Sequence, residues 1–288
     1  MSQNDLNNSL RDYIVGSVSL ALAEDVGTGD LSAALIPETQ SASAVVITRE
    51  NIVLAGSPWF DEVFAQLDAD ITVDWHGEEA SRVKATERLC TVTGPARAVL
   101  TGERTALNFL QMMSATATQA ARYVDAVAST RAIILDTRKT LPGLRLAQKY
   151  AVLCGGAQNH RIGLYDAILI KENHIVAAGG IEAAVTTARD SNTTILIEVE
   201  VENLDQARIA LQSGAHRLLL DNFDLDTLDK AVKLRDAEAP TITLEASGGI
   251  DLDNVSRVAE TGVDFISVGA LTKDIDAADL SMRFELAE

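Results

Sequence analysis

A short stretch of this acidic chain gathers most of the side chains that could bind a small anion. Residues 136–174 hold six Lys and Arg against three acidic residues, whereas the whole chain has a formal charge of −18. The basic residues of the stretch, which also contains His160 and His174, are Arg138, Lys139, Arg145, Lys149, Arg161 and Lys171. A positive focus in a negative molecule suits a small anionic ligand in a cleft. The overall charge argues against nucleic-acid and membrane partners, because both are polyanionic.

Two glycine-containing turns could hold a phosphate group. Ser247-Gly248-Gly249 and Val268-Gly269-Ala270 follow the last two predicted strands. Barrel enzymes commonly bind phosphate at this place, on backbone amides that only glycine lets the ligand approach. The pair therefore predicts a phosphate cradle.

Two acidic residues end neighbouring predicted strands and suggest a metal. Glu200 and Asp221 supply oxygen ligands, which Mg²⁺ prefers, and Mg²⁺ bridges phosphate oxygens. The alternative is that both carboxylates form salt bridges with the arginines.

Other catalytic motifs fail or stay open. Gly27-Thr28-Gly29-Asp30 lacks the third glycine of a dinucleotide fingerprint, and Walker, HExxH and GxSxG motifs are missing from the sequence. Lys171 at a strand end could instead form a Schiff base, as in an aldolase. That reading remains a rival at this point.

The positions of these residues follow from a strand–helix rhythm that starts near residue 132. Apolar, β-branched runs predict strands at Ala132–Asp136, Ala167–Lys171, Thr194–Val201, Arg217–Asp221, Thr241–Ser247 and Asp264–Val268. Helical patterns alternate with them at Leu144–Cys154, Ile181–Arg189, Leu204–Gln212, Leu225–Leu234 and Leu252–Glu260. This alternation predicts a parallel sheet built from βαβ units.

The polar residues favour a barrel over an open sheet. Side chains alternate faces along a strand, so Glu198 and Glu200 share one face of their strand while Ile197 and Val199 face the helices. Several strands finish on a polar residue, as expected where the carboxyl ends meet in a barrel site. With six clear strands, we expect an incomplete, TIM-like α/β barrel.

The first part of the chain predicts a separate α+β domain. Strands are expected at Ser43–Arg49, Ile71–Trp75 and Leu89–Thr93, and helices at Leu10–Glu24, Pro58–Leu67 and Ala96–Met113. The polar amino terminus contains no secretory signal, no run is long enough to span a membrane, and Cys90 and Cys154 show no metal-site spacing. We expect a cytoplasmic protein with reduced thiols.

Several blocks together resemble the quinolinate phosphoribosyltransferase (nicotinate-nucleotide pyrophosphorylase, carboxylating) family. They run in order over about residues 10 to 272: Glu24–Asp30, Gly102–Asn108, Asp136–Gly143, Asn159–Arg161, Ile170–His174, Glu198–Glu200, Leu220–Asn222 and Glu245–Ile250. The resemblance implies an amino-terminal α/β sandwich over residues 1–115, a barrel over 116–272, and a return of 273–288 to the first domain. It also implies a homodimer with shared active sites and leaves further assembly open.

The resemblance also implies substrates and residue roles. Quinolinate would be bound by Arg104 from the partner subunit and by Arg138, Lys139, His160, Arg161 and Lys171. Phosphoribosyl pyrophosphate would lie near Lys139 and His160, with Mg²⁺ held directly or indirectly at Glu200 and Asp221. Its 5′-phosphate would bind at Ser247, Gly248, Gly249, Val268, Gly269 and Ala270. The catalytic residues would be Lys139, Lys171, Glu200 and Asp221.

The implied reaction yields nicotinate mononucleotide, pyrophosphate and CO₂, a step of NAD biosynthesis. Three rivals remain: a related phosphoribosyltransferase-like protein for another heterocyclic acid, the Lys171 aldolase, and a non-catalytic sensor of a phosphate ligand.

Overall fold

The computed structural model describes residues 3–191 and 194–286, and the contacts between them group the chain into two units. The first contains the described residues up to Gln119, then Leu141–Gly156, and then the described residues from Asp274. The second contains Ala120–Thr140 and Ala157–Lys273. Residues 141–156, which the sequence assigned to the barrel, thus group with the first unit.

Aromatic contacts explain this grouping of residues 141–156. The hydroxyl group of Tyr13 donates a hydrogen bond of 2.6 Å to the carbonyl oxygen of Gly143. The Tyr150 ring lies 5.3 Å from that of Trp59, which is fully buried. Contacts this distant in sequence cannot be read from local periodicity.

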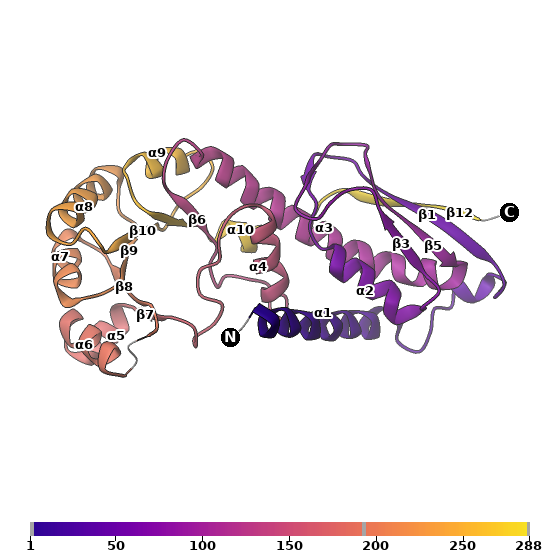
Figure 1. Cartoon of the computed structure of the whole chain (residues 1–288), viewed down its shortest axis with the longest axis horizontal. Coiled ribbons are helices and arrows are strands. Elements are labelled where there is room, and N and C mark those ends of the chain that lie inside the picture. The colour runs from indigo at the N-terminus through magenta and orange to yellow at the C-terminus, as the bar shows by residue number, and fades with distance from the viewer. Residues whose placement is uncertain (1–2, 192–193, 287–288) are drawn as a thin grey trace. The chain divides into compact units, whose positions relative to one another are not determined.

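The first unit is built on an antiparallel sheet in the order β12-β1-β5-β3 (Figure 1). Its strands are β1 (Ser41–Thr48), β3 (Thr72–Trp75), β5 (Arg88–Pro95) and β12 (Leu280–Leu286), and a separate pair is formed by β2 (Ile52–Val53) and β4 (Arg82–Val83). Its other elements are α1 (Gln3–Val26), the 3₁₀ helix Ala33–Leu35, α2 (Ser57–Leu67), the first part of α3 (Ala96–Val127) and α4 (Arg145–Cys154).

Alternation along β1 sets the core of this unit. Ala42, Ala44 and Val46 are fully buried, while the residues between them are partly exposed, as expected for a strand with one covered face. From α2, the rings of Phe60 and Phe64 pack together at 5.2 Å. Full burial of each large apolar side chain contributes roughly 1.5–3 kcal/mol. Burial of its apolar face therefore stabilises the packing of α2 in this unit.

The second unit is a parallel six-stranded sheet in the order β6-β11-β10-β9-β8-β7. Its strands are β6 (Ile133–Leu135), β7 (Ile168–Ile170), β8 (Ile197–Val201), β9 (Arg217–Asp221), β10 (Thr243–Ser247) and β11 (Phe265–Ser267). Its helices are α5 (Glu172–Ala178), α6 (Ile181–Ser191), α7 (Leu204–Ser213), α8 (Leu225–Glu238), α9 (Val255–Glu260) and α10 (Ala270–Lys273). Helices α6 to α9 lie outside the curve of the strands (Figure 1).

This strand order is that of a barrel in which one pair of neighbouring strands, β6 and β7, is not hydrogen-bonded. Each strand pairs with its neighbour in the sequence except β6, which pairs with β11. Within the described residues β6 and β7 do not pair, and Leu135 instead forms a parallel bridge to Gln158. The predicted incomplete α/β barrel with an amino-terminal α/β domain is confirmed.

The two cysteines and the lengths of the helices bear on two further expectations from the sequence. Cys90 and Cys154 are free thiols, Cys90 fully buried and Cys154 half-buried. Burial, together with the nearby charge of Glu79, raises the pKa of Cys154 to about 12. None of the described helices combines the length and apolar character needed to cross a bilayer.

Candidate active site

A cavity of about 260 Å³ opens where the carboxyl ends of the barrel strands meet. Its lining comes from the segment after β6, from the loop before β7, from β7 and the residue after it, and from β8, β9, β10 and β11. The predicted site residues that line it are Arg138, Lys139, His160, Arg161, Lys171, Glu200, Asp221 and Ser247. Residues that are distant in the sequence therefore share one cavity, because parallel strands end at the same edge.

Two guanidinium groups approach each other in this cavity. Burial and then the positive charge of Arg138 lower the pKa of Arg161. Two like charges at one site are unfavourable until an anion lies between them. The side chain of Arg161 is steadied by a hydrogen bond of 3.4 Å from Nη1 to the carbonyl oxygen of Ala167, and Asp166 accepts hydrogen bonds from the backbone of the intervening loop.

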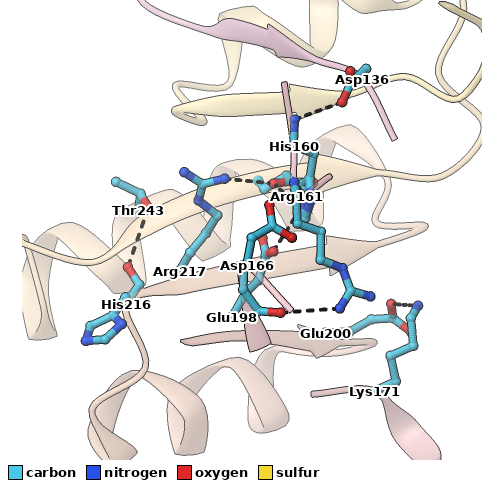
Figure 2. A network of polar contacts seen from close by, with 12 residues as sticks. Asp136, His160, Arg161, Asp166, Lys171, Glu198, Glu200, His216, Arg217 and Thr243 are labelled. Carbon is cyan, nitrogen blue, oxygen red and sulfur yellow. Dashed lines mark hydrogen bonds and ion pairs between the residues drawn. The ribbon is translucent and has the colours of Figure 1, made fainter. Parts of the chain in front are cut away.

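Lys171 and Glu200 form an ion pair at the cavity edge. Lys171 Nζ lies 2.5 Å from Glu200 Oε2, and the lysine side chain is 47% exposed (Figure 2). Lys171 immediately follows β7 and precedes α5, and its backbone N–H donates to His174 Nδ1. A Schiff-base lysine needs a neutral amine in apolar surroundings, so this paired and exposed position weighs against the aldolase.

Glu200 and Asp221 fit a hard cation. Both line the cavity from adjacent strands, both are partly exposed, and a carboxylate offers only oxygen. Asp221 accepts a hydrogen bond of 2.9 Å from Asn222 Nδ2, which leaves its other oxygen for a ligand. Such oxygen donors are what Mg²⁺ requires.

The turn after β10 is shaped by Asn222. Its backbone N–H donates to the carbonyl oxygen of Ser247 at 2.9 Å, and its φ of 58° is positive. A Cβ atom added to Gly248 would lie 2.6 Å from Asn222 Cγ, so only glycine fits. The side chain that steadies Asp221 therefore also shapes the glycine turn.

The two glycine turns offer unused backbone donors. Within the described chain, the N–H groups of Gly248, Gly249 and Gly269 donate to no protein acceptor. A Cβ on Gly269 would lie 3.2 Å from Lys139 Cδ, so the lysine stem lies against this turn. Free N–H groups beside a lysine suit a phosphate.

A buried polar network that sequence reasoning missed extends inward from the cavity, and two of its residues, His160 and Glu245, help to line that cavity (Figure 2). His160 Nε2 is 2.9 Å from Glu198 Oε2 and 3.4 Å from Glu245 Oε2, and Glu245 is 3.3 Å from Arg217 Nη1. Both glutamates are fully buried. Burial and the charge of Glu245 raise the pKa of Glu198 to about 7. Burial also raises the pKa of Glu245, but bonds from His160 outweigh it and bring that pKa below its ordinary value.

Burial and the neighbouring glutamates shift the pKa of His160 in opposite directions. Burial lowers the pKa of His160, but the hydrogen bonds and charges of the two glutamates outweigh it and raise that pKa to about 9. At Nδ1 the backbone N–H of Arg161 approaches to 2.7 Å, which disfavours a second ring proton because two N–H groups would then face each other. In the neutral form of the ring, the hydrogen therefore lies on Nε2.

Other predicted residues are not among those that line this cavity. Arg104 is exposed on α3, in the part of that helix that belongs to the first unit. Val268 is 1% exposed, and its backbone N–H donates to the carbonyl oxygen of Leu135. Gly248, Gly249, Gly269 and Ala270 are not among the residues that line it.

Comparison with known proteins gives one consistent result. Residues 30–114 match the family domain described as quinolinate phosphoribosyl transferase, N-terminal domain, and residues 116–283 match the C-terminal domain. The chain is 41% identical over 263 residues to the probable nicotinate-nucleotide pyrophosphorylase (carboxylating) of Synechocystis, covering 91% of this chain and 89% of that protein.

Human and bacterial relatives extend the similarity. The nicotinate-nucleotide pyrophosphorylase (carboxylating) of Homo sapiens is 40% identical over 254 residues, covering 87% of this chain and 85% of the human one. The solved nicotinate-nucleotide pyrophosphorylase of Francisella tularensis superposes with a TM-score of 0.92 at 46% identity. That match covers 96% of this chain and 97% of the other.

Proposed function

Because this chain belongs to the quinolinate phosphoribosyl transferase family, we propose that the cavity at the barrel's carboxyl end is where it joins quinolinate to phosphoribosyl pyrophosphate. The reaction is that of a nicotinate-nucleotide pyrophosphorylase (carboxylating) and gives nicotinate mononucleotide for NAD synthesis. The observation that carries the residue assignment is the convergence of Arg138, Arg161 and Lys171 on one small cavity.

The three cations match the two adjacent carboxylates of quinolinate. Each guanidinium can engage a carboxylate through two parallel hydrogen bonds, and the mutual repulsion of Arg138 and Arg161 is relieved when an anion enters. Lys171 adds a third positive charge once its contact with Glu200 is exchanged for one with substrate. Binding would thereby orient the ring nitrogen toward the ribose.

Phosphoribosyl pyrophosphate would extend from the Ser247 side of the cavity to the two glycine turns beyond its lining. The backbone donors of the Ser247–Gly249 and Gly269–Ala270 turns suit its 5′-phosphate, and Lys139 lies where it can contact the pyrophosphate. Glu200 and Asp221 would hold Mg²⁺, which would neutralise charge on the departing pyrophosphate. Val268 has no exposed group for this task and would contribute only its place in the turn.

The chemistry then needs alignment more than a nucleophilic residue. The lone pair of the quinolinate nitrogen bonds to the anomeric carbon while the bond from that carbon to the pyrophosphate oxygen breaks and leaves its electron pair on oxygen. The nitrogen becomes positive, so the adjacent ring carbon can lose its carboxylate as CO₂, keep the electron pair and take a proton from water. Arg138, Arg161 and Lys171 hold the ring in place through both events.

A product balance tests the proposal directly. Purified protein with quinolinate, phosphoribosyl pyrophosphate and Mg²⁺ is expected to form nicotinate mononucleotide, pyrophosphate and CO₂ in equal amounts, and none when one component is omitted. Folded protein that yields no product from quinolinate, but yields a nucleotide from nicotinate or another heterocyclic acid, would establish the rival substrate. Binding of phosphoribosyl pyrophosphate without any turnover would establish the sensor.

A second proposal concerns the assembly of the chain into a homodimer and its cellular compartment. Arg104 is exposed, so it is accessible to a second copy of the chain. We assign it to the quinolinate pocket of the partner subunit. The two free cysteines accord with a cytoplasmic, reducing location.

Mixing two inactive variants tests the shared site. Arg104→Ala and Lys171→Ala are each expected to lose most activity, and an equal mixture of exchanged subunits should regain about a quarter of the wild-type rate, because half of the dimers then contain one intact site of two. A mixture no more active than its components would mean that Arg104 serves its own subunit or none.

A further inference from the structure

Lys139 reaches the cavity from a segment that contains neither helix nor strand. The segment lies between β6 and α4 in the sequence, and Lys139 is one of the residues that line the cavity from it. The stem of a lysine is long and flexible, so its ammonium group stays in place only where the stem and the backbone beneath it are held. The position of Lys139 therefore depends on contacts with other elements.

The backbone of Lys139 is held by a threonine of α10. Thr272 Oγ1 donates a hydrogen bond of 2.8 Å to the carbonyl oxygen of Lys139. Thr272 is fully buried, so water cannot take the place of the carbonyl at this hydroxyl group. The bond joins the segment after β6 to the helix that follows β11.

The stem of Lys139 lies against the turn that precedes α10. A Cβ atom added to Gly269 would lie 3.2 Å from Lys139 Cδ and 3.8 Å from Lys139 Nζ. The stem thus occupies space that any other residue at 269 would fill with its own side chain. The ammonium group consequently lies beside the turn to which the 5′-phosphate is assigned.

The bond from Thr272 differs in kind from the other bond to the Lys139 backbone. The N–H of Lys139 donates a hydrogen bond of 3.1 Å to Thr137 Oγ1, but Thr137 belongs to the same segment and moves with it. The turn itself is fixed separately, because the Val268 N–H donates to the carbonyl oxygen of Leu135 at 2.9 Å. Loss of the Thr272 hydroxyl would therefore loosen Lys139 and leave the turn in place.

We propose that Thr272 is a positioning residue for phosphoribosyl pyrophosphate, acting through the backbone of Lys139. The proposal rests on the proposed function, in which Lys139 contacts the pyrophosphate and the Gly269 turn binds the 5′-phosphate. These two groups are at opposite ends of one substrate, so the protein must hold their partners at a fixed separation. Thr272 does not line the cavity, so its effect on the ligand must pass through residues that do.

The test is steady-state kinetics of the full chain with each substrate varied in turn. Thr272→Val keeps the shape of threonine and removes the hydroxyl group, whereas Thr272→Ser keeps the hydroxyl group and removes the methyl group. Thr272→Val is expected to lower kcat/KM for phosphoribosyl pyrophosphate about tenfold and to leave KM for quinolinate within about twofold of wild type. Thr272→Ser should stay within about twofold of wild type for both substrates.

A double-mutant cycle tests the route through Lys139. Lys139→Met removes the ammonium group, and kcat/KM for phosphoribosyl pyrophosphate is compared with and without Thr272→Val in that background. If Thr272 acts through Lys139, its hydroxyl group has nothing left to position, so adding Thr272→Val should change kcat/KM less than about twofold. A second tenfold loss in the double variant would show that Thr272 acts elsewhere.

Thr48→Val is the matched control in the first unit. Thr48 is also fully buried, and its hydroxyl group donates a hydrogen bond of 2.7 Å to the carbonyl oxygen of Glu50. The control should lower the thermal unfolding temperature as Thr272→Val does, but it should leave both KM values unchanged. If Thr272→Val fails to fold, Thr272→Ala provides the comparison, because it differs from Thr272→Ser by the hydroxyl group alone.

The outcomes separate this proposal from the proposed function. Wild type that forms no product from quinolinate overturns the function, and the positioning role with it. Where wild type is active, the role alone is overturned by a folded Thr272→Val with unchanged kinetics, by equal losses for both substrates, or by Thr272→Ser as impaired as Thr272→Val. A selective loss that serine restores supports the role, because a packing defect would respond to the methyl group instead.

Discussion

Replacing Arg138 with methionine is expected to reduce kcat/KM for quinolinate about a hundredfold or more, because a charge-assisted, bidentate contact to a carboxylate is lost. Methionine keeps much of the volume of the side chain, so the free energy of unfolding should change little. The value of KM for phosphoribosyl pyrophosphate should stay close to that of wild type, since Arg138 is assigned to the other substrate. Steady-state kinetics with each substrate varied in turn measures both effects.

The control for Arg138→Met is Arg208→Met, which removes an exposed arginine in the same unit. It should leave both KM values unchanged. Near-normal use of quinolinate by Arg138→Met would remove this residue from the pocket. An equal rise in KM for both substrates would indicate a general distortion of the cavity instead.

Loss of the two carboxylates at the strand ends is expected to raise the Mg²⁺ requirement. Glu200→Gln and Asp221→Asn each replace one anionic oxygen ligand by a neutral amide, so the Mg²⁺ concentration for half-maximal activity should rise about tenfold in each and further in the double variant. Titration with Mn²⁺ followed by magnetic resonance measures the loss of metal binding without turnover. The two changes preserve shape, so folding should be retained.

Lys171→Met is the matched comparison for Glu200→Gln, because each removes one partner of the same ion pair. The lysine variant should bind quinolinate more weakly and keep its metal titration, whereas the glutamine variant should do the reverse. Metal titrations that are unchanged in both carboxylate variants would assign Glu200 and Asp221 to ion pairing alone.

The strands of the barrel could be predicted because their signals are local. Arg217–Asp221 matches β9 at both ends, and Thr241–Ser247 is longer than β10 by two residues. The alternation in β8 also placed Glu198 and Glu200 on the inner face, and both lie there. Such patterns need only the period of two and the burial of one face.

Elements that depend on distant partners were harder to predict. The helix expected at Ala96–Met113 continues to Val127, because its later small and β-branched residues are buried by packing that the sequence does not reveal. Helix α5 was missed because it begins directly after β7 and has no buried residue, so it shows no apolar period.

The same limit applies to the site. That Arg138, Lys171, Glu200 and Asp221 share a cavity follows from strand ends that meet at one edge. The role of Glu245 does not follow in this way, although the structure buries it within β10. Its partner His160 comes from a loop that returns beside β6 through the bridge from Leu135 to Gln158, and that long-range pairing has no local signal.

The contact between Gly248 and Asn222 couples two positions that are distant in the sequence, so that substitutions at one constrain substitutions at the other. A side chain at 248 would displace Asn222, and with it the hydrogen bond to Asp221, whereas a smaller residue at 222 would release Asp221 even though it made room. A substitution at either position alone would therefore disturb the Asp221 carboxylate or the glycine turn. Lineages that depart from this pair must therefore change both positions together, so covariation of the two across relatives would record the constraint.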